Sequence, residues 1–409
     1  MTRNDLNRRD FLRSSAAGAG AFALAPTMSP LSGMSVQGDN KILVVLQLSG
    51  GNDGLNTVVP VDNDDYHKVR RSIRHKPEEC LKLADGVAFS PALKGMRELF
   101  DDGDLSVLQG VGYPKPNRSH FKSMDIWHSA DNSDAFKTSG WLGRLGDLAT
   151  AGAEDPDYTI NLAKSPPLAL SGKSYRPISF QDPNKYRFVG SENEMSTFKK
   201  IAESGGNMQD GGSMQDDILA LVGKISKNAH ASSLEVRKAA SAYRTSVNYG
   251  QSSVGSSLRT ITALINAGLS TRVFYAYHNG FDTHTNQEFR HNQLMEQMDA
   301  AISGFQKDLR RLGLDKRVVM MVFSEFGRRV KENGSRGTDH GTAGPMFMVG
   351  TPIAGGIHGE MPSLTDLDRG DLKFNTDFRS VYATVLQNWL QTNPAKVLGK
   401  EFPQLNLFG

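Results

Sequence analysis

Aspartate, glutamate and histidine side chains gather in segments that directly follow short apolar runs of the chain. The residues are Asp53, Asp282, His284, Glu325, Asp339 and His340. Carboxylate oxygen and imidazole nitrogen are the donors found at hydrolytic Zn, Mn or Fe centres, and a larger share of carboxylate suits Mg or Ca. These six residues are therefore predicted to hold a divalent metal ion, with Zn, Mn, Mg and Ca all open.

Each of these residues also has a structural interpretation. Asp53 lies in a Gly-rich segment, where aspartate commonly closes a turn through a hydrogen bond to its own backbone. Asp282 and His284 could cap the helix that follows them. Glu325 could form an ion pair with one of the two arginines that come shortly after it. The functional and structural interpretations stay open at this point.

The remaining histidines carry weaker signals. Four of them lie in polar or charged surroundings and are expected at the surface: His67, His75, His230 and His291. His358 lies between glycines and is expected in a loop, with metal ligation as the alternative.

The elements that would position these residues can be read from the apolar runs. The runs cover 42–48, 105–108, 272–277, 318–323 and 346–349. Hydrophobicity that is nearly continuous over four to seven residues is typical of strands buried on both faces, as in a parallel sheet. Helical patterns lie between them, so we expect an α/β fold with a doubly wound, mostly parallel sheet and helices on both faces. In such sheets, ligands bind beyond the carboxyl ends of the strands.

Helices are predicted most clearly in the C-terminal half. Leu294, Met298 and Ile302 begin an apolar stripe at helical spacing, on a helix that starts near Gln287. A second helix is expected after an N-cap at Thr376 or Asp377. Strands are scarce between about 131 and 258, which we interpret as a mostly helical insertion, with a mobile, Gly-rich loop at 203–217 that could form a lid.

Composition narrows the class of protein. The chain has 409 residues, of which 38% are apolar and 22% charged, which indicates a globular protein without integral membrane spans. The formal net charge is +3, and most of it lies in the first 13 residues, so no nucleic-acid surface is expected. Cys80 is the single cysteine, which excludes an intramolecular disulfide and a cluster of thiolate ligands.

The N-terminus carries a targeting signal. Arg8 and Arg9 are followed by Phe11 after one spacer and then by a weakly apolar run from Ala16 to Ala25. This pattern resembles a twin-arginine export signal. We expect residues 1–35 to be the signal and linker, the twin-arginine translocase to be a partner, and the protein to reach the periplasm or cell envelope.

Six ordered segments between residue 40 and the C-terminus carry a family resemblance. They read LSGGNDGLNTVVP, RSHFKSMDIW, GFDTHTNQ, SEFGR, GTDHGTAGPMF and TDFRSVYATVLQNWL. Together they resemble the exported bacterial family called domain of unknown function 1501 (DUF1501). That family is similar to the alkaline phosphatase and sulfatase superfamily. The resemblance implies an alkaline phosphatase-like α/β domain over 40–409, with one or two divalent metal ions.

The resemblance also implies roles for the acidic residues and histidines. Asp53 matches the metal-binding aspartate after the first strand. Asp282 and His284 match an Asp–His pair, at a closer spacing than the superfamily uses.

Two alignments stay open for the later ligands. Asp339 and His340 match an Asp-His-Gly motif, or Glu325 takes the strand-end position and His340 is the final histidine. Strand geometry favours the second alignment. Phe326, where the superfamily has His or Asn, would remove a ligand and favours a mononuclear site.

The superfamily nucleophile is a serine or threonine at the start of a helix. Ser119 follows the second strand and opens a helix, so it is the candidate, with Ser123 as the second choice. A helix N-terminus favours an oxyanion; alternatively, Ser119 is only an N-cap. Arg118 and His120 are expected to bind the phosphate or sulfate group of the substrate.

The function expected from these residues is an exported, metal-dependent hydrolase that acts on phosphate or sulfate esters of small molecules or polymers. The alternative is a non-catalytic cell-envelope binding protein that has kept this fold.

Overall fold

The computed structural model describes residues 41–150, 156–186 and 232–409. The expected export signal at 1–35 and the expected loop at 203–217 lie outside the described residues, as does His230. Among the described helices, none is both long and apolar enough to cross a membrane.

A mostly parallel sheet forms the centre of the described residues, in the order β11-β5-β10-β9-β1-β8-β6-β7, with β14 also paired to β5. Its strands are β1 (Ile42–Ser49), β5 (Leu105–Gly112), β6 (Thr159–Asn161), β7 (Ile178–Ser179), β8 (Val273–Asn279), β9 (Val318–Ser324), β10 (Gly344–Val349), β11 (Gly356–His358) and β14 (Thr376–Asp377). Among these described strands, only β10 runs antiparallel to its neighbours, β5 and β9. All five strands predicted from the apolar runs are confirmed.

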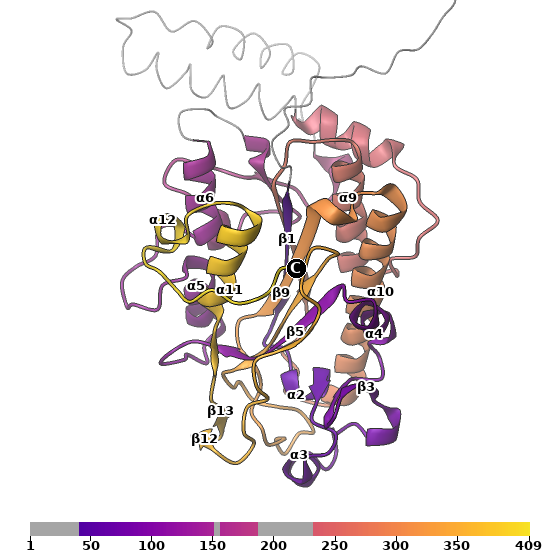
Figure 1. The fold of residues 1–409 in the computed structure, drawn as a ribbon, viewed down its shortest axis with the longest axis vertical. Coiled ribbons are helices and arrows are strands. Elements are labelled where there is room, and N and C mark those ends of the chain that lie inside the picture. The colour runs from indigo at the N-terminus through magenta and orange to yellow at the C-terminus, as the bar shows by residue number, and fades with distance from the viewer. Residues whose placement is uncertain (1–40, 151–155, 187–231) are drawn as a thin grey trace, which may run out of the picture. The chain divides into compact units, whose positions relative to one another are not determined.

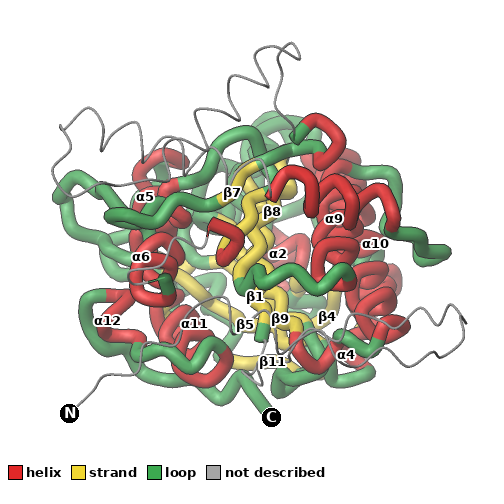
Figure 2. The backbone as a smooth tube through the Cα atoms, turned by 90° about the horizontal axis from the view of Figure 1, so that it is seen from above, coloured by secondary structure: helices red, strands yellow, loops and turns green. Residues whose placement is uncertain are grey.

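Helices cover both faces of this sheet (Figures 1 and 2). One face carries α4 (Lys94–Asp101), α9 (Ser253–Asn266) and α10 (Gln287–Leu312), and the other carries α5 (His120–Ser129), α6 (Trp141–Ala149), α11 (Phe378–Thr384) and α12 (Pro394–Leu398). The expected α/β class is confirmed, as are the helix from Gln287 and the N-cap at Asp377, whose side chain accepts from the backbone N–H of Arg379.

The sequence of β1 explains this layering. Val44 and Leu46 belong to the hydrophobic core on the α9–α10 side, whereas Leu43 and Val45 belong to the core on the α5–α11 side. Alternate side chains of a strand point to opposite faces, so a strand that is covered twice must be apolar at every position. The continuous apolar runs are the direct result.

Smaller elements surround the sheet. They are α2 (Gly54–Thr57), α3 (Asp64–Val69), the small sheet of β2 (Val58–Val59), β3 (Leu81–Ala84) and β4 (Val87–Phe89), and the hairpin of β12 (Leu367–Asp368) and β13 (Asp371–Leu372). Single turns of 3-10 helix lie at Pro77–Glu79, Pro156–Tyr158, Leu168–Leu170, Pro183–Lys185 and Asp315–Arg317, and a turn of π-helix lies at Val385–Trp389.

The stretch expected to be a helical insertion is partly built into the main sheet. Within 131–258, β6 pairs with β8 and β7 pairs with β6, so both strands extend the sheet at one edge. Helical structure is present at α6, at 232–242 and at the start of α9. The remainder, at 187–231, lies outside the described residues, and the lid there stays a prediction.

Candidate metal centre

The site lies where the central strands end. β1 runs parallel to both of its neighbours, with Leu48 opposite Ser324 of β9 and Ser49 opposite Asn279 of β8. The three segments that follow these strands therefore leave the sheet side by side. The loop after β5 reaches the same edge and leads into α5 at His120.

The segment after β1 approaches the segment after β8 closely. Gly50 has φ +120°, in the left-handed region, and a Cβ at this position would clash with the backbone nitrogen of Asp282. Glycine meets both requirements because it has no side chain. The backbone N–H of Gly50 is then free to donate to Glu325 Oε1, at 2.8 Å.

Three imidazoles converge on the carboxylate of Asp282. The Nε2 atoms of His284 and His340 lie 2.9 Å apart, and they lie 3.0 and 3.1 Å from Asp282 Oδ1. His120 Nε2 lies 3.6 Å from Asp282 Oδ2. One ligand atom each from His120, Asp282 and His340 falls within 4.8 Å of the other two. We call these four residues the histidine–aspartate cluster.

The other ring nitrogen of each histidine faces an oxygen of a backbone carbonyl or a carboxyl group. His120 Nδ1 lies 2.7 Å from Glu325 Oε1, and His340 Nδ1 lies 2.8 Å from the backbone carbonyl of Arg118. His284 Nδ1 lies 3.3 Å from Asp339 Oδ1. In a neutral imidazole one nitrogen donates and the other carries a lone pair. If all three rings are neutral and each Nδ1 donates to its oxygen, then all three Nε2 lone pairs face Asp282.

This arrangement fits a cation. Two imidazole nitrogens 2.9 Å apart cannot both present lone pairs without a proton or a metal ion between them. Histidine ligands usually donate their second N–H to a carboxylate or a backbone carbonyl, which is what Glu325, Asp339 and the carbonyl of Arg118 accept here. Three imidazole nitrogens and one carboxylate suit Zn, Mn or Fe better than Mg or Ca.

Arg328 fixes the loops around the histidine–aspartate cluster. Its guanidinium is fully buried and donates to Asp282 Oδ1 at 2.7 Å. It also donates to the carbonyls of Gly50, Gly51, Phe281 and Thr338. Partial burial opposes ionisation of Asp282, but the hydrogen bonds of Arg328 and His340, together with the charges of Arg328 and His284, outweigh it and lower the pKa of this carboxyl to about 2. Asp282 is therefore ionised at neutral pH.

The other titratable groups respond to their immediate neighbours. The hydrogen bond to Glu325 raises the pKa of His120, and burial lowers the pKa of His340. A hydrogen bond from Asn333 lowers the pKa of Asp339. Phe326 packs against the rings of His120 and His340, with both pairs of ring centroids 4.9 Å apart, so it forms an apolar wall of the cluster.

The structure does not bring Asp53 into the histidine–aspartate cluster. Asp53 is fully buried, and its Oδ2 accepts from Arg70 at 2.6 Å and from the side-chain amide of Gln287. Burial disfavours the carboxylate form, yet the charge and hydrogen bond of Arg70 lower the pKa of Asp53. Its carboxylate thus balances a buried arginine.

Gln287 connects this buried pair to the loops of the cluster. Its Oε1 accepts from Thr283 at 3.0 Å and from Thr338 at 2.6 Å, and these threonines adjoin Asp282 and Asp339. Sequence analysis missed Arg70 and Gln287 because an arginine at the end of α3 and a glutamine at a helix start carry no local signal of burial.

Two of the four histidines expected at the surface are buried, so that prediction is wrong for them. His291 and His75 are 1% and 6% exposed. His291 Nε2 lies 3.0 Å from the side-chain oxygen of Asn52, which follows β1. His67 is half-buried, and its Nε2 lies 2.8 Å from the carbonyl of Val61. His358 lies on β11 and outside the cluster, with Nε2 2.8 Å from the carbonyl of Ala354.

The two serine candidates have different environments. Ser123 is fully buried, and its hydroxyl donates to the carbonyl of Glu325 and contacts Tyr113. Ser119 is exposed at the N-terminus of α5, directly before His120, and its side chain caps no N–H of the helix. Arg118 is 37% exposed and forms a 2.5 Å ion pair with the buried Asp371. Ser119 and Arg118 are thus accessible beside the cluster, whereas Ser123 is not.

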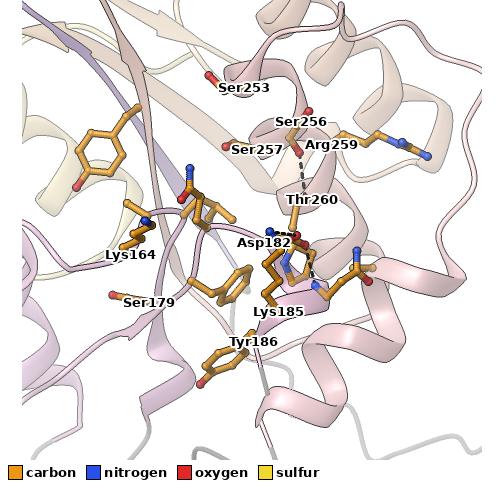
Figure 3. A pocket seen from close by; sticks show the side chains of 18 of the residues that line it. Lys164, Ser179, Asp182, Lys185, Tyr186, Ser253, Ser256, Ser257, Arg259 and Thr260 are labelled. Carbon is orange, nitrogen blue, oxygen red and sulfur yellow. Dashed lines mark hydrogen bonds and ion pairs between the residues drawn. The ribbon is translucent and has the colours of Figure 1, made fainter. Parts of the chain in front are cut away.

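Two clefts open near this edge of the sheet. One, of about 1430 Å³, lies at the ends of β6, β7 and β8; Figure 3 shows Asp182, Lys185 and Tyr186 from one wall and α9 residues such as Arg259 and Thr260 from another. The other, of about 900 Å³, lies beside the histidine–aspartate cluster and is lined by Arg118 and Phe326 among others.

Comparison with known proteins gives one family match. The family described as "Protein of unknown function (DUF1501)" matches residues 104–392. No curated protein matches the sequence.

Several solved structures are similar at low identity. A protein in the alkaline phosphatase superfamily from Vibrio parahaemolyticus is 9% identical, with 90% of this chain and 71% of that chain covered and a TM-score of 0.36. The C-terminal periplasmic domain of EcEptC from Escherichia coli is 8% identical, with 90% and 89% covered and a TM-score of 0.36. The PsFucS1 sulfatase from Pseudoalteromonas sp. is 9% identical, with 88% and 68% covered and a TM-score of 0.35. At such identities and scores, these likenesses carry no information about activity.

Proposed function

This chain belongs to the DUF1501 family, whose function is unknown, and we propose that it is an exported metal-dependent hydrolase of phosphate or sulfate esters. One observation carries the proposal: three imidazole Nε2 atoms converge on one ionised carboxylate, while each Nδ1 lies within hydrogen-bond distance of a separate oxygen. Export by the twin-arginine translocase to the periplasm or cell envelope is part of the proposal and rests on the N-terminal arginine pair.

The residues that would hold the metal ion are those of the histidine–aspartate cluster, namely His120, Asp282, His284 and His340. Glu325 and Asp339, which the sequence suggests as ligands, are proposed to orient His120 and His284 through their Nδ1–H groups. A divalent cation there would supply Lewis acidity, which polarises the ester and lowers the pKa of a nearby hydroxyl.

Ser119 is the proposed nucleophile. Its hydroxyl is exposed and caps no N–H of α5, so the helix N-terminus is free to stabilise negative charge on the reacting group. In the reaction, a bond forms from Ser119 Oγ to phosphorus or sulfur as the ester P–O or S–O bond breaks. The serine proton is released and the leaving oxygen takes up a proton. Water then cleaves the serine ester and restores the hydroxyl.

Arg118 is the proposed anion-binding residue next to the nucleophile. Its guanidinium is held by Asp371 but stays 37% exposed, and its backbone carbonyl holds His340. One short segment thus carries the nucleophile, a substrate-binding cation and two of the groups that shape the metal centre. His120, which the sequence suggests as a substrate-binding residue, is assigned to the metal instead.

The test uses the full chain purified from the exported fraction. We expect bound Zn or Mn by elemental analysis, and turnover of aryl phosphates or aryl sulfates. His340→Ala should lose metal and activity together, whereas His358→Ala, a histidine outside the cluster, should keep both. Ser119→Ala should keep the metal and lose turnover, and Ser133→Ala, in the exposed loop after α5, should resemble the wild type.

Three results would contradict parts of this proposal. Wild-type protein that binds neither Zn nor Mn would remove the metal centre. Turnover retained in Ser119→Ala would remove the nucleophile. Metal binding without turnover of either ester class would instead favour a non-catalytic binding protein.

A further inference from the structure

The cleft of about 900 Å³ is lined by residues that contact the histidine–aspartate cluster. Its walls come from the loop between β5 and α5, the segment between β9 and β10, and the β12–β13 hairpin. Arg118 lines the cleft with its side chain and holds His340 with its carbonyl. Phe326 lines the cleft and packs against both His120 and His340. The cleft and the cluster are thus linked through Arg118 and Phe326, and none of the four cluster residues itself lines the cleft.

Cationic side chains dominate the lining of this cleft. They are Lys115, Arg118, Arg329, Arg369 and Lys373, against the carboxylates of Asp368 and Asp371. We call these five cations the basic groove. The volume of the cleft lies near the upper end of the range for ligand sites. This volume exceeds the space that a single phosphate or sulfate group needs.

Asp371 is one carboxylate beside two arginines of the basic groove, so it cancels only part of their positive charge. The side chain of Asp371 is 2% exposed and lies between Arg118, at 2.5 Å, and Arg329, at 3.6 Å. Both arginines stay partly exposed, at 37% and 36%. The carboxylate thus holds the Arg118 guanidinium in a close ion pair and attracts Arg329 at a longer distance, and both guanidinium groups stay open to an anion.

Two of the cations stand on strained backbone. Lys115 has φ 55° and Arg369 has φ 53°, in the left-handed region that glycine or asparagine normally occupies. Arg369 is followed by Gly370 at φ 90°, and the pair forms the turn of the β12–β13 hairpin, where Asn-Gly would be the usual choice. Backbone strain of this kind is common at ligand sites. Here it falls on two exposed cations that line the same cleft, of which Arg369 also forms a 3.5 Å ion pair with Asp368.

We propose that the basic groove binds further phosphate or sulfate groups of an oligoanionic substrate, a saccharide or phosphate chain that carries several such groups. One group would lie at the metal centre, and the others would lie along Lys115, Arg118 and Arg369. The chemistry of the reacting group rests on the proposed function, whereas binding in the groove rests only on the groove itself. Of the aromatic residues that line the cleft, Tyr113 and Phe326 are 2% and 3% exposed and cannot stack on nucleic-acid bases, whereas Phe374 is half-buried, so the test includes an oligonucleotide.

The test measures binding of defined anions to the full chain after chelation of metal. The probes are a heparin hexasaccharide for a sulfated saccharide, tripolyphosphate for a phosphate chain, and inorganic phosphate as the single-group reference. The variants Lys115→Asn and Arg369→Asn remove the charge and place a residue that tolerates the left-handed backbone, so both should fold. Arg336→Asn is the matched control, because Arg336 also has φ 56° and is exposed but does not line the cleft.

We expect at least one oligoanion to bind more tightly than inorganic phosphate. Each groove variant should weaken that binding about threefold, the scale of one exposed ion pair, and the double variant about tenfold. Arg336→Asn should match the wild type. Preference for heparin or for tripolyphosphate identifies the kind of chain.

Equal binding in the groove variants and in Arg336→Asn would overturn the proposal, as would oligoanions that bind no better than phosphate. A single-stranded oligonucleotide that binds as tightly as the best probe would overturn the choice of a saccharide or phosphate chain. Aryl ester turnover separates the two proposals. Groove binding without turnover contradicts only the hydrolase, and turnover without groove binding contradicts only the groove.

Discussion

The proposed roles of His120 as a metal ligand and of Glu325 as the residue that orients His120 can be tested by a double-mutant cycle on metal affinity. Glu325 is 2% exposed at its side chain, and its Oε1 lies 2.7 Å from His120 Nδ1 and 2.8 Å from the backbone N–H of Gly50. If Glu325 acts only by holding His120, its effect must disappear once the imidazole is absent. If Glu325 binds the metal itself, its effect must survive.

The magnitude follows from the type of contact. Glu325→Gln keeps an oxygen that can accept from His120 Nδ1–H but removes the negative charge that makes the ring a better donor. Loss of such a supporting carboxylate costs about 10–100-fold in metal affinity, or about 1.4–2.7 kcal/mol. His120→Ala removes a ligand and should cost more. In the His120→Ala background, Glu325→Gln should change affinity by less than about threefold, so the coupling equals nearly the whole effect of Glu325→Gln.

The assay is competition of each metal-free protein with a chromophoric chelator for Zn and, separately, for Mn. Thermal melting of the four metal-free proteins checks that the cycle compares folded chains. Arg336→Asn serves again as an exposed control. The reasoning is refuted if Glu325→Gln weakens binding by the same factor in both backgrounds, because additivity would mean that Glu325 contacts the metal independently of His120.

Two further predictions concern stability. Asp53→Asn leaves the fully buried Arg70 without its counter-charge and should lower the free energy of unfolding by about 3–5 kcal/mol. The number of Zn ions bound per chain should stay unchanged. Loss of metal from a folded Asp53→Asn protein would instead mean that Asp53 is a metal ligand. Burial lowers the pKa of His128 to about 3, against about 6.5 in an unfolded chain. As the pH decreases below about 6.5, the unfolded chain binds a proton that the folded protein does not bind, so the free energy of unfolding decreases. Between pH 7.5 and pH 5 this loss of stability is about 2 kcal/mol. In urea unfolding, the free energy of unfolding of His128→Asn should therefore fall by about 2 kcal/mol less than that of the wild type over this pH range. Parallel pH profiles for the two proteins would show that His128 is not held neutral.

The fold could be predicted from sequence to a large extent, because its signals are local. Strand β1 is apolar at each position from Ile42 to Leu46, since helices cover both faces of the sheet. The N-cap at Asp377 and the start of α10 at Gln287 also follow from short-range hydrogen bonding and periodicity. The short strands β6 and β7 escaped prediction, since three and two residues are too few for a periodic pattern.

The sequence by itself determined the kinds of donor and the edge of the sheet where they gather, because parallel strands all end at one edge and ligands collect there. Tertiary structure alone decided which donors meet. Asp53 is paired with Arg70, whereas His120 joins Asp282, His284 and His340 from the start of α5, far earlier in the sequence. The orientation of His340 depends on the backbone carbonyl of Arg118, a group that every residue possesses and that no sequence pattern marks. The sequence specifies the chemistry of each side chain, and the tertiary arrangement of distant segments specifies which carboxylates and imidazoles face one another.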